Sequence, residues 1–415
     1  MNVVISLLGM AVLLGIALAF STNRRGINLR TVGLALGIQF CIGGFVLFVP
    51  WGKLILENIA YAVQQVIDFS HAGVSFMLGN LVNEKTMDTV FGGPNSGFVF
   101  AFRVLPVIIF FSSFIAVLYH LKIMQVVINL IGGSLQKILG TSRAESMSAA
   151  ANIFVGQTEA PLVVRPYIAN MTRSELFAIM SGGLASIAGT VLAGYSEMGL
   201  DLKFLIAGCF MAAPGGLLFA KILLPETEKP TDETLQGPEE DLPANVFDAA
   251  ATGASNGLKL AANVGAMLLA FIGLIALING MVGGIGGLFG YSDLTLQGIL
   301  GAIFSPLAWV LGVPWSEAYQ AGSFIGQKLI LNEFVAYLDF IGAKDSLLPR
   351  TQVIVTLALC GFANLSSIAI LLGGIGGMAP SRRKEIASLG LRAVLAGSLS
   401  NFMSAAIAGV FITFG

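Results

Sequence analysis

Long apolar stretches separated by short polar connections make up most of this chain. Several of them reach the roughly 20 residues that a helix needs to cross the hydrocarbon core of a membrane. The first stretch has neither a cationic start nor a cleavage site, so we expect it to be retained. The pattern predicts an all-α polytopic membrane protein with eight transmembrane helices, over residues 3–20, 32–50, 98–118, 175–197, 203–224, 257–282, 352–376 and 387–413.

Two further apolar regions are interrupted by polar residues and do not read as simple spans. Residues 142–172 are broken by the run from Gly156 to Pro161, and residues 308–341 are broken around Gln327–Asn332. The first region should begin and end inside the cell, and the second outside. Irregular backbone at membrane depth is tolerated only where protein buries it or a watery cavity borders it. We therefore expect two oppositely oriented re-entrant hairpins.

The same order of features occurs twice along the chain. Val155-Gly156-Gln157 matches Ile325-Gly326-Gln327, and the stretch Gly183–Gly189 matches Gly361–Ser367. Each half reads as a hairpin, a span with a Gly/Ser/Asn-rich centre and a final span, and one intervening span reverses the second half. This predicts an inverted repeat, an arrangement in which transporters bind their substrate near the midplane at the repeat interface.

These features divide the chain into five parts. Three spans with interfacial helices occupy 1–141, and a first repeat with a hairpin and two spans occupies 142–225. An acidic cytoplasmic linker, rich in Pro, Glu, Asp and Thr as solvated segments are, occupies 226–244. A single span lies in 245–285, and a second repeat in 295–415.

Composition and charge support this membrane assignment. Of the 415 residues, 56% are hydrophobic and 11% charged, whereas soluble domains carry about 25% charged residues. The net charge of −1 provides no nucleic-acid footprint. The positive-inside rule assigns four loops to the cytoplasm, which places both termini outside. These loops contain Arg24, Arg25 and Arg30; Lys122, Lys137 and Arg143; Arg165 and Arg173; and Arg382, Arg383 and Lys384.

Polar side chains in the interruptions are the candidates for function. A carboxylate at the bilayer centre costs about 3 kcal/mol, and close helix packing requires only small residues such as Gly182 and Gly183. The pocket would also contain Thr158, Phe362 and Val191, and Lys328 is its one nearby cation, so an anionic substrate is not favoured. Hydroxyl-accepting carboxylates, amides and an aromatic face suit a neutral, ring-bearing polar solute. The functional set is Gln157, Glu159, Glu333, Asn364 and Ser367.

Three motifs together carry a resemblance to a known family. The runs Asn152–Pro161, Asn332–Val335 and Gly361–Ser367 resemble those of the concentrative nucleoside transporters, especially their bacterial sodium-coupled members, and the likeness covers nearly the whole chain. It implies import of a uridine-like nucleoside with sodium across the bacterial inner (plasma) membrane. It also implies a homotrimer in which 1–141 and 245–285 form a lipid-embedded scaffold and the two repeats move by an elevator mechanism.

The resemblance also assigns roles residue by residue. Gln157, Thr158 and Glu159 would contact the base, and Glu333, Asn364 and Ser367 the ribose. Val191, Leu260 and Phe362 would line the base pocket. The sodium ion would be bound by the side chains of Asn152 and Ser186 and by the carbonyls of Val155 and Ile187. Oxygen ligands from unwound helix ends suit such an ion, and no other cofactor is expected.

Three alternatives remain beside sodium symport. The nearest is proton coupling, because Glu159 and Glu333 are midplane carboxylates of the kind used in proton relays. A membrane-embedded enzyme is disfavoured because the sequence has no recognisable nucleophile–base motif and no histidine or cysteine constellation. A channel is disfavoured because two opposed hairpins around one polar cluster suit alternating access better than a continuous pore.

Overall fold

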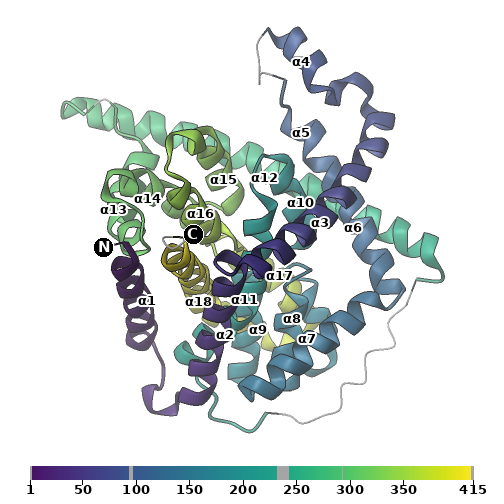
Figure 1. Ribbon diagram of the computed structural model, residues 1–415, viewed down its shortest axis with the longest axis vertical. Helices are drawn as coiled ribbons and strands as arrows, with labels where there is room; N and C mark the ends of the chain where they lie inside the picture. The colour runs from purple at the N-terminus through teal and green to yellow at the C-terminus, as the bar shows by residue number, and fades with distance from the viewer. Residues whose placement is uncertain (1, 93–96, 231–242, 292, 413–415) are drawn as a thin grey trace.

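The computed structural model describes residues 2–92, 97–230, 243–291 and 293–412, and all regular elements within these ranges are helical (Figure 1). A long helix, α3, carries α4 away from the packed body of the molecule. The elements up to residue 139 are α1 (Asn2–Ala19), η1 (Arg24–Gly26), α2 (Leu29–Leu47), α3 (Pro50–Leu78), η2 (Gly79–Val82), α4 (Glu84–Phe91), α5 (Phe100–Arg103), α6 (Leu105–His120) and α7 (Ile123–Leu139).

The rest of the chain repeats one order of elements, a helix, a break, a second helical segment, a broken helix and a final helix. The first set is α8 (Arg143–Ala151), η3 (Ala160–Tyr167), α9 (Arg173–Ala185), α10 (Gly189–Glu197) and α11 (Leu202–Leu223). After α12 (Val246–Leu288) and α13 (Leu296–Val310) come α14 (Trp315–Ile330), α15 (Glu333–Ala343), η4 (Lys344–Ser346), α16 (Pro349–Leu359), α17 (Ser367–Met378), η5 (Pro380–Arg382) and α18 (Arg383–Phe411).

Helices lie at all eight predicted spans, and the structure refines their lengths. Six helical stretches are long and apolar enough to cross a membrane, and a seventh is obtained if α13 and α14, bent by 116°, are counted as one span. Helix α12 extends beyond the predicted 257–282 at both ends. The chain is therefore a multi-helix membrane protein.

The apolar helices fall into an inner and an outer group. In the most apolar window of α9 with α10, 94% of residues are buried inside the protein, and α11 and α18 are similar. The corresponding share is only 22% for α6 and for α12, which pack against each other. The inner group consequently forms the core, and the outer helices leave most of their apolar surface uncovered within this chain.

Local sequence signals position the first repeat. Ser142 and Glu145 form a capping box at the start of α8, and Thr172 and Glu175 form another at the start of α9. Each box satisfies two backbone N–H groups that a helix start leaves without partners. The region predicted as 142–172 thus ends where α9 begins, at Thr172.

A buried ion pair joins the first repeat at one end. Lys221 of α11 pairs with Glu145 of α8, and its Nζ also donates to Ser174 Oγ at 2.9 Å. Glu226 accepts from Thr172 Oγ1 at 2.7 Å, so the start of the predicted 226–244 linker is attached to this end. Residues 231–242 of that linker lie outside the described residues.

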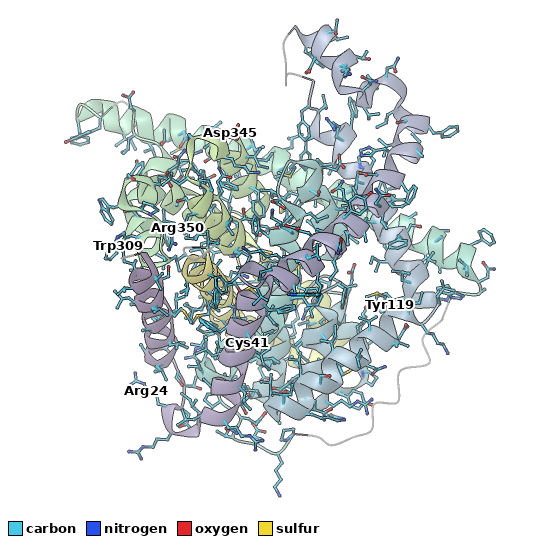
Figure 2. The ribbon with its side chains drawn as sticks, in the orientation of Figure 1. Arg24, Cys41, Tyr119, Trp309, Asp345 and Arg350 are labelled. Atoms are coloured by element: carbon cyan, nitrogen blue, oxygen red, sulfur yellow. The ribbon has the colours of Figure 1, made fainter. Side chains whose placement is uncertain are left out.

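In Figure 2, Arg24 lies toward the bottom of the view and Asp345 toward the top of the packed body, below the level that α4 reaches. Arg382 joins the two repeats, because its Nη1 donates to Met171 O at 2.7 Å. It also pairs with Glu385 through Nε at 2.6 Å.

Candidate functional site

The first polar interruption is an irregular segment between α8 and η3. It spans 152–159, and Glu159 Oε2 accepts the Gly156 N–H at 3.0 Å, which ties the segment into a turn. Gln157 is 4% exposed. A Cβ at Gly183 would lie 2.9 Å from Gln157 Cβ, so the absence of a side chain there lets α9 approach the segment. Thr158 makes the equivalent close approach to Gly374 of α17.

The first broken helix contacts that segment directly. Helix α9 ends at Ala185, Ser186–Ala188 are not helical, and α10 begins at Gly189. The Gly189 N–H donates to Phe154 O at 3.0 Å. Side chains of two irregular segments are thereby brought together in the inner core of the protein.

The predicted sodium ligands lie at this junction. Asn152 and Ser186 are each 1% exposed, and both amide atoms of Asn152 and the Ser186 hydroxyl have no hydrogen-bond partner in the protein. A buried polar atom without a partner needs an explanation, and a bound ion or water is one. Val155 and Ile187 occupy the adjoining non-helical backbone. This donor set of amide, hydroxyl and carbonyl oxygens fits a hard monovalent cation.

The described residues contain no cluster of three His, Cys, Asp or Glu side chains that could hold a metal ion. The side chains at the candidate ion site, Asn152 and Ser186, offer neutral oxygens.

The second interruption is shorter than the sequence pattern predicted. Helix α14 continues through Gln327 and Lys328 to Ile330, and only Leu331 and Asn332 separate it from α15. The Asn332 side chain caps α15 by accepting the Val335 N–H at 2.9 Å. Gln327 is thus a helical residue, and its Nε2 donates to Asp339 at 2.6 Å.

Glu333 is the first residue of α15 and is held on both carboxylate oxygens. Its Oε1 accepts from Tyr195 OH at 3.1 Å, and its Oε2 accepts from Asn364 Nδ2 at 3.0 Å. It is 2% exposed. The partial positive charge of a helix N-terminus favours a carboxylate at this position. The two hydrogen bonds fix its orientation before any substrate arrives.

The second broken helix completes this arrangement. Helix α16 ends at Leu359 and α17 begins at Ser367. Asn364 Oδ1 accepts from Ser366 Oγ at 2.7 Å and from the Ser367 N–H at 2.9 Å. The Leu365 N–H donates to Leu329 O at 3.2 Å. The second break thus contacts α14 through one backbone hydrogen bond, as the first break contacts the segment 152–159 through the bond from Gly189 to Phe154.

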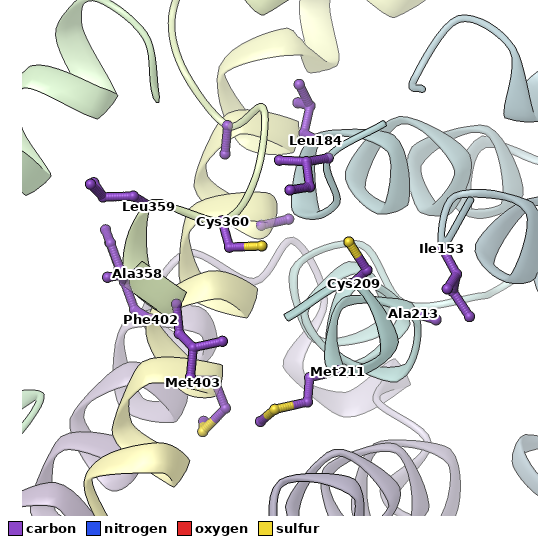
Figure 3. Close-up of a cluster of buried hydrophobic side chains, with 14 of the residues drawn as sticks. Ile153, Leu184, Cys209, Met211, Ala213, Ala358, Leu359, Cys360, Phe402 and Met403 are labelled. Carbon is purple, nitrogen blue, oxygen red and sulfur yellow. The ribbon is translucent and has the colours of Figure 1, made fainter. Parts of the chain in front are cut away.

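The two breaks also meet each other. The Phe362 N–H donates to Ser186 O at 3.1 Å, which joins a candidate sodium ligand to a candidate substrate residue through one backbone hydrogen bond. Figure 3 shows the apolar packing beneath this junction, with Leu184 of α9, Cys360 at the end of α16 and Cys209 of α11 in one cluster. Within the described residues all three cysteines are free.

The pocket-lining residues are placed less uniformly. Val191 of α10 is 2% exposed and belongs to the core. Phe362 is half-buried in the second break, and Leu260 is half-buried on α12, outside both repeats. Leu260 would therefore reach the site only from the outer group of helices.

The sequence pattern did not predict three residues that hold the site together. Tyr195 binds Glu333 and packs against Phe334 and Tyr337, with ring centroids 4.6 and 4.9 Å apart. Lys328, named from the sequence only as a nearby cation, is fully buried, and its partners are the Asn401 amide oxygen and the Ala358 carbonyl. Its amide partner is Asn401 of α18, the one amide in a run of small and apolar residues, which a search for polar residues at membrane depth could have found.

Comparisons with known proteins match most of the chain to nucleoside transporters. Residues 8–81 and 204–409 match the models described as the N-terminus and C-terminus of the Na⁺-dependent nucleoside transporter, and residues 101–200 match one described as nucleoside recognition. The chain is 58% identical to an uncharacterised transporter of Haemophilus influenzae (100% of this chain, 99% of the relative). It is 53% identical to the nucleoside permease NupC of Helicobacter pylori (98% and 97%).

A solved structure shares the fold. The structure of CNTnw in an inward-facing substrate-bound state superposes with a TM-score of 0.96 at 60% identity and covers 100% of this chain and 99% of that one.

Proposed function

This chain belongs to the sodium-dependent concentrative nucleoside transporter family and is a nucleoside transporter, and we propose that it imports nucleosides by symport with sodium. The observation that carries the proposal is the hydrogen bond between Phe362 N–H and Ser186 O, because the residues that would hold sodium and those that would hold the nucleoside would then meet at one backbone contact. Two ligands that share one backbone junction are expected to influence each other's affinity.

The substrate would be held at two ends. Glu333 is oriented by Tyr195 and Asn364 and would accept hydrogen bonds from the ribose hydroxyls. Asn364 and Ser367 would complete the ribose contacts, and Gln157, Thr158 and Glu159 would contact the base edge. Val191, Phe362 and, from α12, Leu260 would provide the apolar faces of the pocket.

The coupling ion would bind at the first break. The Asn152 and Ser186 side chains would replace part of the hydration shell of sodium, together with the carbonyls of Val155 and Ile187. Their unpartnered state makes the site costly without an ion, and binding would order Ser186 and, through its carbonyl, Phe362. Sodium would in this way prepare the pocket for the nucleoside.

We further propose the larger-scale arrangement. The two repeats, 142–225 and 295–415, would be oppositely oriented with their hairpins entering from opposite faces. They would move together against a scaffold built from 1–141 and 245–285 in a homotrimer. The protein would lie in a bacterial inner membrane with both termini outside, and the outer helices, whose apolar faces this chain leaves uncovered, would face lipid and neighbouring protomers.

Uptake of labelled uridine into proteoliposomes tests the coupling. An inward sodium gradient should drive uridine above equilibrium, while a matched choline gradient should not. Accumulation driven by a proton gradient and indifferent to sodium would refute sodium coupling and favour Glu159 or Glu333 as a proton carrier. Flux that never saturates and never accumulates uphill would refute symport altogether.

A further inference from the structure

Asn401 lies on α18, outside both broken helices, yet it contacts the two of them and Lys328 of α14. Its Nδ2 donates to Ala185 O at 2.6 Å and to Cys360 O at 2.7 Å, and its Oδ1 accepts from Lys328 Nζ at 2.6 Å. The residue is 2% exposed. A primary amide has two N–H donors and one carbonyl oxygen, and here both donors and the oxygen have partners.

The two carbonyls that Asn401 binds belong to equivalent places. Ala185 is the last residue of α9, and Cys360 directly follows α16. The last carbonyls of a helix lack partners within it, so a single side chain caps both half-helices. The next residue after Ala185 is Ser186, and two residues after Cys360 comes Phe362. Each cap therefore sets where a ligand-binding segment leaves its helix.

Lys328 fixes the orientation of the Asn401 amide. Its ammonium group has donors and no acceptor, so the amide oxygen must face it and the amide nitrogen must face the two carbonyls. Lys328 is held in turn by Ala358 O at 2.8 Å and lies 5.7 Å from the centre of the Phe402 ring. A side chain at Gly361 would overlap the Asn401 amide, which explains why the chain has glycine beside this cap.

We propose that Asn401, oriented by Lys328, is a positioning residue that couples the sodium half of the site to the nucleoside half. This inference rests on the proposed sodium symport. When sodium pulls Ser186 into its ligand shell, the end of α9 shifts, and Asn401 transmits that shift to the end of α16 because one rigid amide holds both carbonyls. The backbone bond between Ser186 and Phe362 alone would join two non-helical segments, whereas the amide joins the ends of their helices.

The test measures uridine binding with and without sodium. Isothermal titration of the purified full-length protein gives the uridine Kd in sodium and in an equal concentration of choline, and their ratio is the coupling. Asn401→Leu removes all three hydrogen bonds. Asn401→Asp keeps an acceptor for Lys328 but removes both donors to the helix ends. Both variants should lower the ratio by about tenfold, within the usual range of coupling between two sites.

A second position separates orientation from capping. Lys328→Met removes the ammonium and leaves the Asn401 donors in place, so it should lower the ratio less than Asn401→Asp does. Ser404→Ala is the matched control, because Ser404 lies one turn further along α18 and bonds to Gln39 rather than to a broken helix. It should keep the wild-type ratio even where its melting temperature falls.

The outcomes distinguish a failure of sodium coupling from a failure of the role proposed for Asn401. A wild-type ratio near one would refute sodium coupling itself, and the inference with it. A large wild-type ratio that persists in Asn401→Leu or Asn401→Asp would overturn the role of Asn401 alone. Equal loss of coupling in Ser404→Ala would also overturn it, because general loosening of α18 would then suffice. If Asn401→Leu does not fold, Asn401→Asp, with nearly the same side-chain volume, decides the question.

Discussion

The two breaks in the core differ in how their polar atoms are satisfied. At the first, both amide atoms of Asn152 and the hydroxyl of Ser186 are buried without protein partners. At the second, both carboxylate oxygens of Glu333 and both amide atoms of Asn364 are hydrogen-bonded. Unpartnered buried groups are costly and await a ligand, whereas a satisfied network is rigid before binding. On the function proposed above, the same backbone device would serve as an ion site at the first break and as a fixed sugar anchor at the second.

The largest expected effect comes from the second break, where the polar atoms are hydrogen-bonded. Glu333→Ala should reduce nucleoside uptake by about 100-fold, because two charge-assisted hydrogen bonds are lost and the ribose loses its acceptor. Initial rates of labelled uridine uptake measure the loss, with insertion and assembly checked by size-exclusion chromatography. Asp345→Ala, at an exposed acid of the same repeat, should leave uptake unchanged. Unchanged uptake by Glu333→Ala would contradict the proposal that Glu333 binds the ribose.

A substitution at the first break, where Asn152 and Ser186 have no protein partners, should change how uptake depends on sodium rather than on nucleoside. Asn152→Leu should raise the sodium concentration for half-maximal uptake by about tenfold, since one oxygen ligand is lost while the Glu333 network is untouched. The uridine KM at saturating sodium should change far less. An Asn152→Leu variant with normal sodium dependence and a raised uridine KM would reverse the two assignments.

A substitution with a smaller expected effect tests the close approach of α9 to the irregular segment 152–159. A methyl group at residue 183 would contact Gln157, so Gly183→Ala should push the base-contacting residues aside and raise the uridine KM by roughly fivefold. Gly373→Ala is the matched control, because a Cβ there meets nothing within 4 Å. Similar KM values in the two variants would contradict a base role for this segment.

The smallest expected effect lies outside both breaks. His71 of α3 faces Glu197 of α10 with Nε2 to Oε1 at 3.3 Å, and Asp68 and Arg103 are its other charged neighbours. The hydrogen bond to Glu197 is the main cause that raises the pKa of His71 above 6.5. The contact is therefore strongest at low pH and is lost as pH rises through the raised pKa.

Because His71 is partly exposed, the consequence for stability is modest. The melting temperature of the wild type should exceed that of His71→Gln by about 1 °C near pH 6 and match it near pH 9. A difference that grows with pH would contradict this sign. The neighbouring hydrogen bond from Ser196 to Gln64, 2.8 Å long, does not titrate, and Gln64→Ala should lower the melting temperature equally at both pH values.

The sequence predicted the helices and both breaks because apolar length and polar interruptions are local signals. It also placed Asn152, Ser186, Glu333 and Asn364 in one site through the family motifs, and the structure brings these four to adjoining breaks. The end of α14 was predicted too early, because a glutamine and a lysine read as an interruption when helix packing had in fact buried both. Propensity alone cannot show that a lysine has found partners on another helix.

Asn401 and Tyr195 illustrate what local patterns omit. Each is one polar side chain among several in its helix, and its importance depends on partners far away in the sequence, 216 positions for the bond from Asn401 to Ala185. Only the packed structure shows which of the many polar residues in the spans reach a break.

That long-range bond has a consequence for how the protein is made. The end of α9 leaves the ribosome long before α18 does, so the first broken helix spends that time without the Asn401 cap. A chain that stops before α18 would lack Asn401 and would leave Ala185 O and Cys360 O without the side chain that caps them. The first broken helix is therefore completed only when α18, the last helix, is inserted, and we expect a competent transporter to require this final step of synthesis.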